Sequence, residues 1–235
     1  MGRCPRILPD TISSGSAPTG ALALFLAMTK YFSVHPQNPQ VRLLRQAADM
    51  LAQGSVAAVP TDSCYAIACH LDDKPAVETI RRIRNIGERH HLTLLCRDLS
   101  EIASYARVDN ATYRLLRLAT PGPYTFILEA TREVPRRVSH PSRKTIGIRV
   151  PDHPVALQLL RELGQPLIGS SLQLPGDELP LNDVEEIRAR LDHEIDLVLD
   201  AGSCGVQPST VIDVTSGTVK VLRQGKGALE PLGLA

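Results

Sequence analysis

Short apolar runs alternate with segments of helical periodicity from about residue 54 to residue 223. Runs such as 56–59, 92–96 and 124–128 have the length of strands, and the segments between them repeat apolar residues three and four apart. This alternation favours an α/β (α+β) fold in which a twisted mixed sheet is flanked by helices. Neither an internal repeat nor a linker interrupts it, so we expect a single domain.

Capping and turn residues predict where the elements begin and end. Asn38 followed by Pro39 predicts the start of the first helix, and Gly54 predicts its end. Asp98 and Glu101 have the spacing of a capping box. We expect strands at 56–59, 92–96, 124–128, 145–150, 167–170, 197–199, 211–214 and 219–222, and helices that begin near Asn38, Pro75, Asp98, Tyr113, Pro154 and Asp183.

The first 28 residues differ from the rest of the chain. Residues 1–19 are rich in Pro, Ser, Gly and Thr without periodicity, a composition that does not offset the entropy cost of ordering. The apolar run at 21–27 is much shorter than the roughly 20 residues of a membrane span. We therefore predict that residues 1–28 are a poorly ordered extension or a mis-assigned start, with Met28 as the alternative first residue, and that the protein does not enter a membrane.

The cysteines and the charges narrow the class of protein. An odd number of cysteines, five at wide spacing, does not describe a disulfide framework and predicts reduced thiols in the cytoplasm, with Cys64, Cys69 and Cys96 in the core. Residues 78–149 carry 14 Lys and Arg against 7 acids, whereas residues 152–200 carry 3 Arg against 11 acids. This asymmetry suits a polyanionic ligand on one side of the molecule. The alternative is two solvated faces that meet no ligand.

Polar residues joined to Pro or Gly recur where the expected strands end. The motif Pro60-Thr61-Asp62-Ser63 follows one strand, and Pro208-Ser209-Thr210 precedes another. Each motif alone is typical of a turn or cap, but their recurrence favours a ligand site. Common phosphate-loop, zinc-protease and nucleophile-elbow motifs do not occur. His90 and His91 are adjacent and would point to opposite faces of a strand, so we predict no metal site.

Five motifs in this order resemble the YrdC-like (threonylcarbamoyl-AMP synthase) superfamily over about residues 31–227. They are Val-Pro-Thr-Asp-Ser at 59–63, Pro-Gly-Pro-x-Thr at 121–125, Arg-Val-Pro-x-His-Pro at 149–154, Pro-Ser-Thr-Val-x-Asp at 208–213 and Leu-Arg-x-Gly at 222–225. Residues 31–36, 97–100 and 134–137 look closest to the YciO-type branch. The resemblance implies a YrdC/RibB-like fold with a concave basic cleft.

The same resemblance implies an activity and a set of ligands. Synthases of this superfamily combine L-threonine, bicarbonate and ATP into threonylcarbamoyl-AMP and pyrophosphate, the first step of the N6-threonylcarbamoyl modification of tRNA adenosine. Mg²⁺ would accompany the ATP, and no catalytic residue is implied. By resemblance, Arg84, Thr125, Ser171 and Arg223 would bind ATP, and Thr61, His90, Arg149 and Ser209 would bind threonine.

Two departures from the family pattern fall on the nucleotide side. Ile86 stands where the synthases carry the second cation of a Lys-x-Arg pair, whose first cation is Arg84 here. Gln173 replaces the Asn of a Ser-x-Asn motif, and Pro175 replaces a Ser. The loss of a phosphate-facing cation would weaken transition-state stabilisation.

These departures keep two alternatives to the synthase open. One is a non-catalytic protein that binds double-stranded RNA, tRNA or rRNA through the same basic cleft, because phosphate contacts come from Lys and Arg. Its predicted contacts are Arg81, Arg82, Arg136, Arg137, Arg143 and Lys144. The other alternative is an enzyme that uses this cleft for a different carbamoyl or adenylyl transfer.

Overall fold

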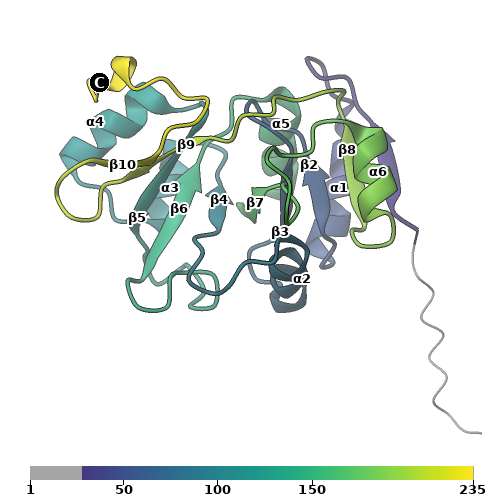
Figure 1. The fold of residues 1–235 in the computed structure, drawn as a ribbon, viewed down its shortest axis with the longest axis horizontal. Helices are drawn as coiled ribbons and strands as arrows, with labels where there is room; N and C mark the ends of the chain where they lie inside the picture. Colours follow the sequence, from purple (N-terminus) through teal and green to yellow (C-terminus); the bar gives the residue numbers. More distant parts are fainter. Residues whose placement is uncertain (1–27, 235) are drawn as a thin grey trace, which may run out of the picture.

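The computed structural model describes residues 28–234, which form a single α/β domain around one ten-stranded mixed sheet (Figure 1). The strand order is β1-β8-β2-β3-β7-β4-β6-β5-β9-β10. Four neighbouring pairs are parallel and five are antiparallel, which confirms the predicted mixed sheet. The strands are β1 (Lys30–Ser33), β2 (Ala57–Val59), β3 (Ala66–His70), β4 (Thr93–Leu95), β5 (Tyr124–Glu129), β6 (Thr145–Arg149), β7 (Leu167–Ser171), β8 (Leu197–Asp200), β9 (Thr210–Asp213) and β10 (Lys220–Arg223).

Helices cover both faces of the sheet. The pair α1 (Val41–Ala52) and α5 (Pro154–Leu163) packs together over one face. The buried residues of the remaining helices join a second apolar cluster on the other face. These are α2 (Lys74–Arg84), α3 (Leu99–Tyr105), α4 (Asn110–Ala119), α6 (Val184–Leu191) and the short 3₁₀ helix η1 (Glu230–Leu232).

Strand β2 shows how the two clusters arise from sequence. Successive side chains of a strand point to opposite faces. Ala57 and Val59 accordingly join the cluster beneath α1 and α5, whereas Ala58 joins the cluster on the other face. A strand that is buried on both faces has apolar residues at every position. This is why the strand was predicted from a continuous apolar run and not from alternating apolar and polar residues.

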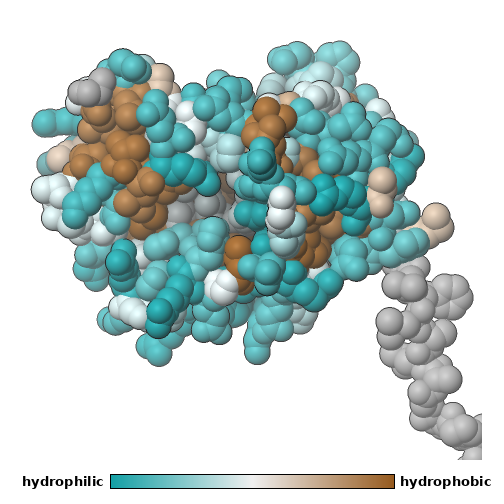
Figure 2. Space-filling view, viewed as in Figure 1, coloured by the Kyte–Doolittle hydropathy of each residue, from teal (hydrophilic) through white to brown (hydrophobic). Residues whose placement is uncertain are grey.

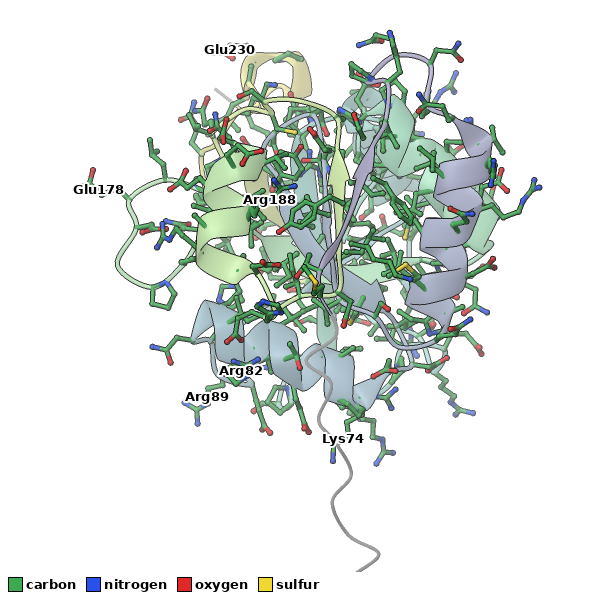
Figure 3. The ribbon with its side chains drawn as sticks, turned by 90° about the vertical axis from the view of Figure 1, so that its right-hand side faces the viewer. Lys74, Arg82, Arg89, Glu178, Arg188 and Glu230 are labelled. Carbon is green, nitrogen blue, oxygen red and sulfur yellow. The ribbon has the colours of Figure 1, made fainter. Side chains whose placement is uncertain are left out.

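Most predicted caps are confirmed. The Asp98 carboxylate accepts the Glu101 N–H at 2.9 Å, and the Glu101 side chain accepts the N–H of Arg97 in return. Asp183 caps α6 by accepting the N–H groups of Glu185 and Glu186 at 2.8 and 3.1 Å. Arg188 on α6 lies 4.1 Å above the ring of Tyr31, so this helix is fastened over β1 (Figure 3).

The start of α1 was predicted wrongly. The helix begins at Val41 with Gln40 at its N-cap, not at Asn38 and Pro39. Asn38 instead donates its N–H to His35 Nδ1 at 3.1 Å within a preceding turn, so its capping tendency serves that turn. Helix α4 begins at Asn110, three residues before the expected Tyr113, because the Asp109 carboxylate caps it through the Thr112 N–H.

Strands β1 and β3 were not predicted. Lys30–Ser33 has no clear alternation of buried and exposed positions, and Ala66–His70 is built largely from residues of low β-propensity. Strand β1 pairs with β8, which is distant in sequence, and β3 pairs with the preceding strand β2 and with the distant strand β7. The predicted extension at residues 1–28 lies outside the described residues except for Met28, and no helix of residues 28–234 is long and apolar enough to cross a membrane.

Candidate functional site

The loop between β2 and β3 is held together by a buried hydroxyl. Thr61 Oγ1 donates to the carbonyl oxygen of Cys64 at 2.6 Å and accepts the N–H groups of Ser63 and Cys64 at 3.3 Å. Thr61 is 2% exposed. Such local side-chain bonds are how Thr fixes a turn. The first motif therefore forms a rigid wall rather than a mobile loop.

Arg149, at the end of β6, ties this wall to two other motifs. Its Nη1 donates to Ser63 Oγ at 2.8 Å, its Nη2 forms an ion pair with Asp62, and its Nε donates to the Gly122 carbonyl at 3.3 Å. Asp62 also accepts the Asp152 N–H at 3.1 Å. The guanidinium thus uses most of its N–H donors in bonds within the protein, so its main role is to hold these segments together.

The two last motifs are clamped together by Thr210. Its hydroxyl donates to the Gly227 carbonyl at 2.6 Å and accepts the Gly225 N–H at 2.9 Å. A Cβ atom on Gly225 would lie 2.1 Å from the Pro208 carbonyl oxygen, so only glycine allows this approach. The clamp aligns Arg223, whose Nη2 donates to the Ser209 carbonyl at 2.9 Å. Ser209 Oγ in turn lies 2.7 Å from Thr125 Oγ1.

All eight side chains predicted for ATP and threonine line one cavity. Its outer part has a volume of about 270 Å³, and a small inner recess shares Thr125, Ser171 and Ser209 with it. Figure 2 shows the side of the molecule hollowed near its middle, between the α4 end and the α6 end. Arg84, His90 and Arg223 line the outer part, and Thr61 and Arg149 line the recess. The roles assigned to these residues remain predictions.

The cavity is strongly electropositive. Among the residues that the structure describes, no Asp or Glu lines it. Arg84 and Arg223 form no ion pair with any described carboxylate, and Arg84 Nε is buried without a hydrogen-bond partner. Burial lowers the pKa of both guanidinium groups, and a neighbouring cation adds to the effect in each case, Arg223 for Arg84 and Arg149 for Arg223. A buried donor without a partner, here Arg84 Nε, points to an anionic ligand.

His90 stands at the mouth of the cavity among these cations. Partial removal of its ring from water, together with the charges of Arg84, Arg81 and Arg223, lowers the pKa of His90. The imidazole is therefore neutral near pH 7 and can accept a hydrogen bond. Residues 28–234 contain no group of three or more His, Cys, Asp or Glu side chains that could hold a metal ion, and the absence of a metal site stays a prediction.

The residues predicted to bind RNA do not line this cavity. Arg81 turns back to donate to the Gly87 carbonyl at 2.6 Å, and Arg82 pairs with Glu194 at 2.7 Å. Arg137 reaches Asp72, and Arg136, Arg143 and Lys144 belong to the β5–β6 loop. None of these six side chains therefore lies in the lining of the cavity, and their role in RNA binding stays a prediction.

The three departures from the family pattern also lie outside the cavity lining. Ile86 is partly buried against the main apolar cluster. Gln173 Nε2 donates to the carbonyl oxygens of Asp177 and Glu178 at 2.9 and 3.2 Å, which closes its own loop. The positive charge in the lining of the cavity therefore does not depend on these three positions.

Sequence reasoning missed several lining residues. Thr93 on β4 and Ser170 on β7 line both parts of the cavity, and Arg89 and His91 line the outer part. Figure 3 shows Arg89 beyond the end of α2, near Arg82. Thr93 and Ser170 come together because β4 and β7 are neighbouring strands, and Arg89 and His91 lie in the segment between α2 and β4. Cys64, Cys69 and Cys96 are buried and unpaired, as predicted.

Comparison with known proteins decides the family. Residues 49–225 match the model of a family named for Sua5, YciO and YrdC, whose description reads telomere recombination. The chain belongs to the Sua5/YciO/YrdC family. It is 49% identical to the uncharacterised protein YciO of Escherichia coli K12 over 87% of this chain and 99% of that protein. The crystal structure of E. coli YciO superimposes with a TM-score of 0.85 over 87% of this chain and 100% of that chain.

Other members of the Sua5/YciO/YrdC family carry the name of an enzyme. A threonylcarbamoyl-AMP synthase of Vibrio vulnificus is 31% identical over 77% of this chain and 98% of that protein. Sua5 of P. abyssi, solved with L-threonine, has a TM-score of 0.80 at 24% identity over 86% of this chain and 59% of that chain, which supports the fold alone.

Proposed function

We propose that this protein is a threonylcarbamoyl-AMP synthase of the Sua5/YciO/YrdC family, which joins L-threonine, bicarbonate and ATP. The observation that carries the proposal is the cavity that combines two arginines without an ion pair, Arg84 and Arg223, with a recess lined by hydroxyl groups and by no described carboxylate. Relatives at 31% identity bear the name of this enzyme.

The chemistry divides between the two parts of the cavity. The threonine amine and bicarbonate form a carbamate and release water. The carbamate oxygen then attacks the α-phosphorus of ATP, and pyrophosphate leaves. Negative charge builds on the triphosphate in this step, and Arg84 and Arg223 supply fixed positive charge in a site partly removed from water. Hydroxyls of Thr125, Ser171 and Ser209 offer donors for carboxylate and phosphate oxygens.

The cavity fits an ATP anion better than it fits a free magnesium ion. Mg²⁺ is usually held by one or two carboxylates together with substrate phosphates. No described carboxylate lines this cavity. We therefore expect Mg²⁺ to be held by the ATP phosphates and water, with Thr and Ser hydroxyls as its only protein neighbours.

The test measures product formation. Purified protein is incubated with Mg·ATP, L-threonine and labelled bicarbonate, and threonylcarbamoyl-AMP and pyrophosphate are quantified by chromatography. We expect both products, and neither when threonine or bicarbonate is omitted. Arg84→Met should abolish them, whereas Arg82→Met, on the same helix but paired with Glu194 outside the cavity, should not.

The outcomes separate the proposal from other chemistry in the same cavity. Failure to form product at enzyme concentrations near those of the substrates rejects synthase activity. Pyrophosphate release that depends on a different amino acid, or that proceeds without bicarbonate, points to another adenylyl transfer. Equal activity of the Arg84→Met and Arg82→Met proteins would reject the assignment of the cavity as the site.

A further inference from the structure

A second basic hollow lies in the loop between β5 and β6, apart from the cavity. It has a volume of about 340 Å³ and is lined by Arg132, Arg136 and Lys144, with Thr131 and Ser139 beside them. It shares no lining residue with the cavity, and no Asp or Glu lines it. Three positive charges therefore surround one space without a counter-charge in its wall.

The loop that presents these cations is built on a fixed frame. Val134 and Val138 are 5% and 1% exposed and belong to the main apolar cluster, so they anchor the loop on both sides of Arg136. The Thr131 hydroxyl donates to the Ser104 carbonyl at 2.8 Å. At the far end, the Lys144 N–H donates to the His140 carbonyl at 2.9 Å. The hollow is thus held in shape by the protein itself.

Several cations elsewhere on the surface are matched by a carboxylate, whereas the three cations of the hollow share one space without a described one. Arg82, Arg107 and Arg190 each pair with a carboxylate, and within this same loop Arg137 turns away to Asp72. Arg132, Arg136 and Lys144 form no ion pair with any residue between 28 and 234, and their side-chain nitrogens donate no hydrogen bond there. The nearby acid Glu133 is exposed and does not line the hollow.

We propose that this hollow binds a phosphate-class anion independently of the cavity. Two guanidinium groups and one ammonium match the several oxygens and the multiple charge of phosphate, and Arg is suited to bidentate phosphate contacts. A single carboxylate would leave at least two of the three charges unmatched. A free oligophosphate and an RNA backbone both supply such phosphates, and the experiment distinguishes the two sources.

The experiment compares two triple variants of the full chain. The hollow variant carries Arg132→Gln, Arg136→Gln and Lys144→Asn; Asn suits position 144 because its φ is 54°. The control variant carries Arg42→Gln, Arg114→Gln and Arg117→Gln, which removes the same charge from exposed helix positions far from any shared hollow. Tripolyphosphate is titrated by NMR, with the amides of Ser139 and Lys144 reporting on the hollow and those of Thr125 and Ser209 on the cavity.

For a free oligophosphate, we expect shifts at Ser139 and Lys144 that the hollow variant loses, with affinity reduced at least tenfold. The control variant and Arg84→Met should keep these shifts, since neither touches the hollow. For an RNA backbone, duplex RNA binding should fall in the hollow variant. The slope of log affinity against log salt should also become shallower by roughly 2.7, because each phosphate contact contributes about −0.9. Loss of binding in the hollow variant with either probe supports the proposal, and the probe that is affected identifies the source of the phosphates.

Three results would overturn it. Equal weakening in the hollow and control variants would mean that net charge, not the hollow, attracts the probe. Shifts confined to Thr125 and Ser209 would mean that phosphate enters the cavity only. Unchanged shifts with both tripolyphosphate and RNA would leave the hollow without a phosphate ligand. None of these results bears on synthase activity, which is measured separately.

Discussion

Arg149 and Asp62 form an ion pair that is almost completely withdrawn from water, with side chains 6% and 11% exposed. The pair joins the end of β6 to the loop after β2, two segments 87 residues apart in sequence. Asp62 Oδ2 is buried without a hydrogen-bond partner, so the pair is held by one carboxylate oxygen. Removing either partner leaves the other charge buried, shielded from water and uncompensated.

We therefore expect Asp62→Ala to destabilise the fold by about 3–5 kcal/mol, because the Arg149 charge would stay buried without its partner. Urea unfolding measures the change. Glu194→Ala is the matched control, since it removes the partner of Arg82 in an exposed pair and should cost no more than about 1 kcal/mol. Similar losses in both variants would contradict the structural role given to Asp62.

Arg84 should show opposite effects on stability and binding. Its Nε is buried without a partner, which costs about 1–3 kcal/mol for a donor. Arg84→Met should therefore leave the ligand-free protein as stable as the parent or more so, and should weaken ATP binding at least tenfold. Calorimetry of unfolding and of ATP binding checks the two parts. A variant that loses stability and keeps its ATP affinity would refute the assignment.

The pH dependence of stability should depend in part on His153. Its Nδ1 accepts the Val155 N–H at 3.3 Å as the N-cap of α5, and burial lowers its pKa from the ordinary value of 6.5. As pH falls below about 6.5, the unfolded chain takes up a proton before the folded chain does, so stability declines. Unfolding at a series of pH values measures the slope.

Two variants separate the cap from the titration. His153→Asn keeps a capping side chain and removes the ionisable group, so its stability should match the parent at pH 8 and decline less on acidification. His153→Ala removes both and should lose about 1 kcal/mol already at pH 8. Parallel pH curves for the parent and His153→Asn would show that other groups carry the acid sensitivity.

Thr210 should affect the site without touching a ligand. Thr210→Val keeps the shape but removes the bonds to Gly227 and Gly225, which should cost about 2 kcal/mol of stability. Because the clamp aligns Arg223 with Ser209, ATP binding should weaken as well. Thr79→Val on α2, whose hydroxyl forms no hydrogen bond with any residue between 28 and 234, is the control. An unchanged ATP affinity in a folded Thr210→Val protein would separate the clamp from the site.

Local signals in the sequence predicted most elements because their causes are local. The caps at Asp98 and Asp183 act on N–H groups two or three residues away, so a short window contains both partners. Strand β1 was missed because its partner β8 lies far along the chain, and β3 was missed because its residues have low β-propensity and it lies between β2 and the distant strand β7. The cap at Asn38 was wrong because a neighbouring turn at His35 competes for the same residue.

The sequence by itself determined the family motifs, the single mixed-sheet domain and eight of the side chains that line the cavity. Only the tertiary structure decided which cationic side chains are left without an ion pair. Ile86 and Gln173 read as losses on the nucleotide side, yet one packs on the core and the other closes its own loop. Arg82 and Arg137 read as phosphate contacts, yet each meets an acid distant in sequence. The register between strands depends on residues far apart in the chain, and so does the pairing of each donor with its acceptor. A short stretch of sequence does not contain both partners, so it cannot predict either.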